Sequence, residues 1–173
     1  DIYVTNGPGQ DNGLFSNQLQ ETGELRFIDL ASTAGVGAAD HDSSGVCFGD
    51  IDNDADPDLF VLSNFGPNRL FENQGDGTFV DATPQAGPGF DLRYSSRGLA
   101  VGDLDDDGDL DLLFTHLDEP PTLLRNDSIG GHWIGVRIVP APGDGPEIGT
   151  RIRVEAGSRI WRRDIARGDS FLS

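Results

Sequence analysis

Lysine and methionine are absent from this 173-residue chain, and cysteine occurs only once. All 12 basic residues are therefore arginine, whereas 30 residues are Asp or Glu, and the formal net charge is −18. A protein that binds nucleic acid needs a basic face for the phosphates, so this charge excludes nucleic acid as an expected partner. The single cysteine, Cys47, excludes a disulfide within the chain and leaves the redox compartment open.

Long hydrophobic runs are missing as well. The longest purely apolar stretches have about four residues, such as 59–62, whereas a membrane-spanning helix needs roughly 20. We therefore expect no membrane insertion. The sequence opens without Met, a charged segment or an apolar signal core, so we expect that any targeting segment has been removed or lies outside it. Glycine (24) and proline (10) are abundant, which favours many short strands over long helices.

An internal repeat organises residues 1–129. Ser43–Asp50 aligns with Ser96–Asp103, and an Asp-rich loop and an apolar run follow each segment. Residues 1–4 are a third copy of the apolar run, and the copies lie 57 and 53 residues apart. This period is typical of a propeller blade of about four short strands. Apolar residues at consecutive positions, as in 59–62, predict strands buried on both faces. We therefore predict an all-β fold with about two and a half propeller blades in residues 1–129.

The two Asp-rich loops place carboxylates at alternate positions. Side chains two residues apart on a curved loop can converge on one ion, and Ca²⁺ takes six to eight oxygens. Each loop is expected to bind one Ca²⁺ through four side chains and the backbone carbonyl of its fourth Asp. The expected ligands are Asp50, Asp52, Asp54, Asp56 and Asp58 in the first loop and Asp103, Asp105, Asp107, Asp109 and Asp111 in the second.

Position six differs between the loops, because Gly108 stands in the second and Ala55 in the first. If the position needs positive φ, alanine is strained there by about 1 kcal/mol, so we expect the second loop to bind more tightly. The alternative is that both loops are solvated turns, but alternate Asp at two equivalent places repel one another without a cation. Mg²⁺ fits less well because it prefers a rigid octahedron with several waters. EF-hands are excluded because the Glu at position 12 and flanking helices are missing.

These motifs, together with Asn73-x-Gly75-Asp76-Gly77-Thr78-Phe79-x-Asp81, resemble FG-GAP (VCBS-type) repeats. The resemblance covers about residues 1–128 and implies the calcium-bearing propeller blades of integrin α subunits and of many secreted bacterial proteins. Residues 132–137, 148–154 and 168–173 resemble part of the ASPIC/UnbV domain, which follows such repeats in the cartilage acidic protein family. We thus divide the chain into FG-GAP-like repeats (1–129) and a partial ASPIC/UnbV-like β module (130–173).

The charge is divided unevenly between these two parts. Residues 1–129 carry a net charge of −20, and residues 130–173 carry +2. Alternation around Ile152 and Val154 predicts a half-exposed strand, with neighbours in residues 133–139 and 160–165. Its arginine face could bind an acidic glycan or the acidic repeats of the same or another chain, or it could be an ordinary solvated face.

The other candidate functional residues have simpler structural interpretations. His41 could be a ligand or a base, but a surface-loop histidine is the favoured interpretation. Cys47 stands where the next repeat has Ala100, so it is expected to be a small buried residue. Asn126-Asp127-Ser128 is a glycosylation sequon. Trp133 and Trp161 could be sugar platforms or core residues, of which the core is favoured. No motif pairs a nucleophile with a base, so we expect no enzyme and no catalytic residue.

The sequence therefore indicates a secreted, extracellular or cell-surface calcium-binding β-repeat protein that acts in adhesion, ligand binding or assembly. Closure of a propeller takes roughly four to eight blades. The expected partners are thus other copies of the chain or the rest of a longer protein, with extracellular protein or glycan ligands possible. The alternative is a catalytic or non-catalytic fragment of a polysaccharide-active enzyme or a lectin.

Overall fold

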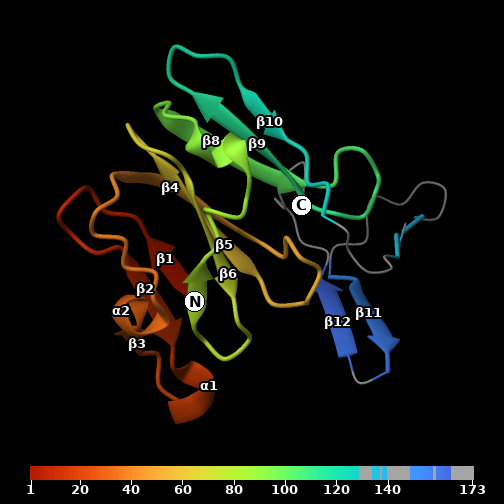
Figure 1. Ribbon diagram of the computed structural model, residues 1–173. Coiled ribbons are helices and arrows are strands. Elements are labelled where there is room, and N and C mark those ends of the chain that lie inside the picture. Colours follow the sequence, from red (N-terminus) through yellow and green to blue (C-terminus); the bar gives the residue numbers. More distant parts are fainter. Residues whose placement is uncertain (129–133, 137, 140–148, 158, 165–173) are drawn as a thin grey trace.

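Three antiparallel sheets follow one another along the chain in the computed structural model, which describes residues 1–128, 134–136, 138–139, 149–157 and 159–164 (Figure 1). In the first sheet, β2 (Gly13–Asn17) lies between β1 (Ile2–Val4) and β3 (Phe27–Asp29). The second contains β4 (Ser43–Gly49), β5 (Asp58–Ser63), β6 (Arg69–Asn73) and β7 (Phe79–Asp81), in that order. In the third, β9 (Asp111–His116) lies between β8 (Ser96–Gly102) and β10 (Thr122–Leu124).

The predicted unit of four strands is confirmed in full only for the second sheet. Within the described residues, the first and third sheets have three strands each. The repeat register is nevertheless the same, because β5 pairs with β4 and β6 just as β9 pairs with β8 and β10. Strand β1 corresponds to β5 and β9, so the first sheet lacks the counterpart of β4 among the described residues.

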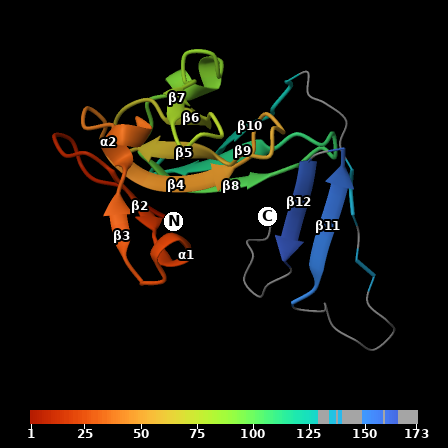
Figure 2. The same cartoon turned by 90° about the horizontal axis from the view of Figure 1, so that it is seen from below.

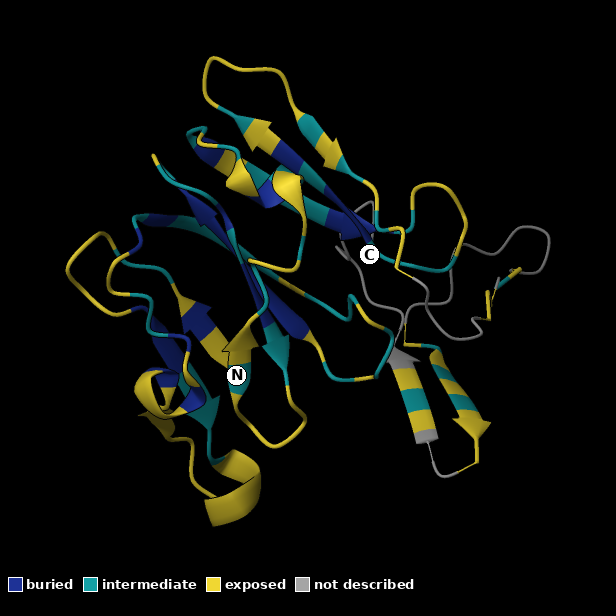
Figure 3. Cartoon of the chain, viewed as in Figure 1, coloured by how far each residue is buried: buried dark blue, intermediate teal, exposed yellow. Residues whose placement is uncertain are grey.

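Strand β5 is the centre of the fold, and all six of its residues are buried (Figure 3). Leu59 and Val61 belong to the hydrophobic core shared with the first sheet. Phe60 and Leu62, which point to the opposite face, belong to the core shared with the third sheet. The prediction of sheets stacked face to face is therefore confirmed, and it explains why polar residues are missing from this run.

The connections explain the difference in repeat length. Between β6 and β7 the chain turns through Gly75 and Gly77, whose φ angles of 72° and 90° are readily reached by glycine. In the first repeat the corresponding connection carries the short helix α1 (Leu19–Thr22), which ends at Gly23 with φ 75°. Helix α2 (Ala31–Ala34) follows β3, and the 3₁₀ helix η1 (Pro88–Asp91) follows β7.

The C-terminal part contains a hairpin of β11 (Arg151–Ala156) and β12 (Arg159–Asp164), which stands to one side of the three sheets (Figures 1 and 2). The predicted strands around Ile152 and over 160–165 are confirmed for 151–156 and 159–164. The prediction of a strand over 133–139 is wrong for 134–136 and 138–139, and residues 133 and 137 lie outside the described residues. Within the described part of the chain, no helix is long and apolar enough to cross a bilayer.

Candidate metal centre

One Asp-rich loop connects β4 to β5, and the other connects the equivalent strands β8 and β9. The loops have the same unusual backbone, with positive φ at their fourth and sixth positions. Asn53 and Ala55 have φ 60° and 80°, and Asp106 and Gly108 have φ 61° and 96°. The positive φ inferred for Ala55 from its alignment with Gly108 is therefore confirmed. Two left-handed residues, separated by one residue, fold each loop back toward its own beginning.

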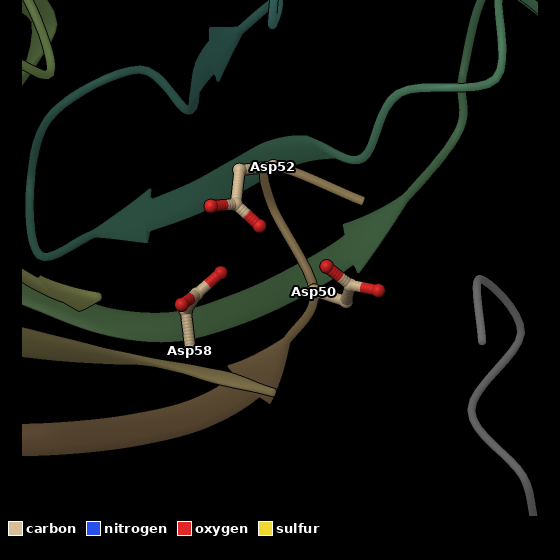
Figure 4. Close-up of side chains that lie close together, drawn as sticks. All are labelled: Asp50, Asp52 and Asp58. Carbon is tan, nitrogen blue, oxygen red and sulfur yellow. The ribbon is translucent and has the colours of Figure 1, made fainter. Parts of the chain in front are cut away.

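This fold brings together the carboxylates of the first, third and ninth loop positions. Figure 4 shows Asp50, Asp52 and Asp58 with their oxygens turned toward a common space. One carboxylate oxygen of each lies within 4.8 Å of the others, and Asp103, Asp105 and Asp111 form the same arrangement in the second loop. Close carboxylates repel one another in the absence of a cation. Each trio is thus a set of hard oxygen donors of the kind that Ca²⁺ prefers.

The ninth-position Asp is held rigidly by backbone amides. Asp58 is fully buried, and its two oxygens accept hydrogen bonds from Ile51 N and Asn73 N, both at 2.8 Å. Asp111 accepts the equivalent bonds from Leu104 N (2.8 Å) and Asn126 N (2.9 Å). A carboxylate oxygen has more than one lone pair, so these bonds leave room for an ion. The ninth-position carboxylate therefore links the loop to the neighbouring strand and still offers lone pairs to an ion in the trio.

The first-position Asp closes the loop on itself. Asp50 accepts hydrogen bonds from Asp54 N and Ala55 N, both at 3.0 Å. Asp103 accepts from Asp107 N at 3.1 Å and from Gly108 N at 3.0 Å. In both loops the amide of the left-handed sixth residue thus donates to the first carboxylate.

Four of the expected ligands lie outside the trios. The fifth-position carboxylates bond to their own loops, because Asp54 accepts from Asp56 N at 2.8 Å and Asp107 accepts from Asp109 N at 3.0 Å. The structure therefore brings together six of the ten expected residues, and the ligand roles of all ten stay predictions. The residues outside the trios are Asp54, Asp56, Asp107 and Asp109.

Burial changes the acidity of the first trio. Desolvation raises the pKa of Asp58 to about 6 despite its two amide bonds. It also raises the pKa of Asp50 and of Asp52, and the neighbouring charge of Glu72 adds to the rise at Asp52. A bound cation would favour the ionised form of all three.

Two charged neighbours of the trios escaped sequence reasoning. Glu72 and Arg125 each precede the asparagine that donates to the ninth-position carboxylate, so they occupy equivalent places. Arg125 lies 3.7 Å from Asp105 and forms a 2.6 Å ion pair with Asp127. The alignment of residues 70–73 with 123–126 could have indicated the equivalence, but the proximity to the loops depends on strand pairing.

The two loops also contact each other. Asn53 Nδ2 donates to Asp109 Oδ1 at 2.7 Å, and Asn126 Nδ2 donates to the Ile51 carbonyl at 2.9 Å. The second bond is relevant to the glycosylation sequon, because Asn126 is the residue that would carry the glycan. Asn126 Oδ1 is occupied too, by Ser128 N (3.1 Å) and Ser128 Oγ. Asn126 is therefore a half-buried brace between two repeats.

The interpretation of His41 as a surface-loop residue is wrong. His41 is only 4% exposed, because it belongs to a polar network between the first two sheets. Its Nε2 donates to the Pro67 carbonyl (2.8 Å), and its Nδ1 accepts from Ser43 Oγ (2.9 Å). Asn12 Nδ2 donates to both Ser43 Oγ (3.0 Å) and Tyr3 Oη (2.9 Å). Burial lowers the pKa of His41, which favours the neutral ring that this pattern requires.

The arginine-bearing C-terminal module is described only in part. Arg153 forms an ion pair with Glu155 on the same strand. Trp161 is half-buried and lies opposite Val154. The expected features at residues 132–133, 137 and 168–173 lie outside the described residues, and the ASPIC/UnbV resemblance stays a prediction.

The stacked antiparallel sheets with their Asp loops form a β-repeat fold, and residues 50–114 match the model of the FG-GAP-like repeat family, whose repeats are of the propeller type. The chain is also similar to cartilage acidic protein 1. The human protein is 38% identical over 109 residues, which are 63% of this chain and 16% of the relative. The mouse protein is 37% identical over 109 residues (63% and 17%), and the Xenopus tropicalis protein is 37% identical over 87 residues (50% and 13%). The chain thus spans about a sixth of these relatives.

Proposed function

We propose that this chain is a secreted, calcium-binding β-repeat protein that acts in adhesion, ligand binding or extracellular assembly. The observation that carries the proposal is the pair of Asp trios, which have the same geometry in two stacked repeats. The residues present fit Ca²⁺, because every donor is a carboxylate oxygen and each trio is clamped by backbone amides. The similarity to a protein named for cartilage supports an extracellular location.

Calcium would supply two positive charges to each trio, and the chain supplies the framework. Asp50, Asp52 and Asp58 would hold one ion, and Asp103, Asp105 and Asp111 would hold the other. Because the ninth-position Asp begins a buried strand, an ion bound there would fasten the loop to the hydrophobic core. Binding to the native state alone would raise stability by mass action.

A non-catalytic role is part of the proposal. Two serine–histidine contacts superficially resemble nucleophile–base pairs, namely Ser43 with His41 (2.9 Å) and Ser96 with His116 (3.1 Å). However, the two serines are only 7% and 1% exposed. Each contact therefore serves internal hydrogen bonding, which supports a binding or assembly role.

We also propose that further sheets of the same kind cover the end faces of the stack, in a longer protein or in an assembly of copies. Ile2 and Val4 are 51% and 42% exposed, whereas their repeat equivalents Leu59 and Val61 are fully buried. The first sheet thus offers outward the same apolar positions that the second sheet buries against it. Natural proteins cover such faces. A stable, monodisperse monomer of 18.5 kDa in solution would contradict this part of the proposal.

The decisive experiment is metal analysis of the dialysed protein together with thermal unfolding. We expect two Ca²⁺ per chain, and a lower melting temperature after chelation that calcium restores and magnesium does not. Asp50→Asn with Asp52→Asn, and Asp103→Asn with Asp105→Asn, should each remove one ion. An unchanged melting temperature and no retained calcium would refute the proposal.

A further inference from the structure

The residue that precedes the bracing asparagine differs in charge between the repeats. Asn17, Asn73 and Asn126 each donate a backbone hydrogen bond to the Asp that begins the buried strand of their own repeat, at 2.9, 2.8 and 2.9 Å. This shared contact fixes the structural equivalence of Glu72 and Arg125. Both occupy the strand end beside the Asp loop of their repeat.

The side chain at this equivalent position is therefore opposite in charge in the two repeats, although Arg125 also pairs with Asp127 at 2.6 Å. Arg125 lies 3.7 Å from Asp105, which is one of the three converging carboxylates of the second loop. Glu72 and Asp52 line a surface cavity between the second and third sheets, and Arg125 and Asp127 line it as well. A cation entering the second trio meets a guanidinium that already interacts with one of its donors. A cation entering the first trio meets an additional carboxylate.

We propose that Arg125 is a built-in counter-ion of the second site that weakens cation binding there, and that Glu72 strengthens binding at the first. This inference rests on the proposed calcium function. It opposes the backbone difference, in which Ala55 is strained and Gly108 is not. The relative calcium affinity of the two sites therefore reflects two competing features, backbone strain and neighbouring charge. The charged residues set the difference between the calcium concentrations at which the two sites fill.

The size of the effect follows from Coulomb's law in a solvated site. Reversing a unit charge at a distance of roughly 8 Å from a divalent ion changes binding on the order of tenfold at low ionic strength. The side chain of Arg125 is 60% exposed, so salt should screen much of this effect. A dependence on ionic strength thus separates a charge effect from a change in loop structure.

The test uses single-site proteins. Asp50→Asn with Asp52→Asn leaves only the second site, and Asp103→Asn with Asp105→Asn leaves only the first. In the protein with only the second site, we expect Arg125→Glu to tighten calcium binding on the order of tenfold. In the protein with only the first site, Glu72→Arg should weaken calcium binding similarly. Calorimetry at low and at high salt should show both changes shrinking as salt increases. The calcium-induced rise in melting temperature should grow in the Arg125→Glu variant, which provides a second measurement.

Arg93→Glu is the matched control, because it makes the same charge change at an exposed arginine. Arg93 precedes β8, whereas the Asp loop follows that strand, so seven strand residues, roughly 20 Å, separate it from the loop. If Arg125→Glu changes affinity no more than Arg93→Glu, or loosens binding, the inference is overturned while calcium binding itself stands. If the single-site proteins bind no calcium, the proposed function fails first.

Discussion

Replacement of Ala55 by glycine tests the backbone geometry of the first Asp loop. Ala55 has φ 80°, and Gly108 has φ 96° at the equivalent position. An L-residue in the left-handed region is strained by about 1–2 kcal/mol. The substitution relieves this strain, but it also adds unfolded-state entropy that costs about 0.4–1 kcal/mol. We therefore expect Ala55→Gly to raise the free energy of unfolding by up to about 1 kcal/mol, and Gly108→Ala to lower it by a similar amount.

Urea unfolding with saturating calcium and with chelator measures this effect. A change of 1 kcal/mol corresponds to about 2–4 °C in melting temperature for a chain of this size. It also corresponds to about fivefold in calcium affinity if the loop adopts its left-handed backbone conformation only with calcium bound. Calorimetry would then show tighter binding at the first site in Ala55→Gly and weaker binding at the second in Gly108→Ala.

Ala39→Gly is the control, because Ala39 is exposed and has no positive φ. This change should only destabilise the protein. If Ala55→Gly destabilises it as much as Ala39→Gly does, Ala55 carries no backbone strain. The common register of the two loops, on which the assignment of both trios depends, would then be wrong.

Two further predictions concern single side chains. Without calcium, the protein should become more stable as the pH falls from 7 to 5. The reason is that the folded pKa of Asp58, about 6, lies above its ordinary value of 3.8, so this stabilisation is lost as the pH rises through 6. Urea unfolding in a His41→Gln background, which removes the opposite contribution of His41, should show this trend, and a flat profile would refute it. Asp58→Asn should weaken the trend, and the raised pKa values of Asp50 and Asp52 account for what is left. In a glycosylating host, mass spectrometry of the folded protein should find Asn126 unmodified, because its Nδ2 is bonded to the Ile51 carbonyl; a glycan there on folded protein would contradict the brace.

Local patterns determined the repeated elements. Side chains of a strand alternate between faces with a period of two, so an apolar run such as 59–62 predicted a strand buried on both sides. The Asp spacing identified both loops, and the alignment of Ala55 with Gly108 identified the positive φ. These features depend on neighbours in sequence and on steric limits of the backbone, which is why they could be predicted without coordinates.

Tertiary structure decided which carboxylates converge and what surrounds them. Asp54 and Asp107 have the right spacing for ligands, but they accept bonds from the amides of Asp56 and Asp109 and lie outside the converging trios. His41 looked exposed between two Asp residues, yet the packing of the first two sheets buries it. Arg125 follows Asp105 by twenty residues and reaches it only because β10 pairs antiparallel with β9. Contacts between distant residues depend on register and sheet stacking, and a local pattern carries no information about which charge they bring to a site.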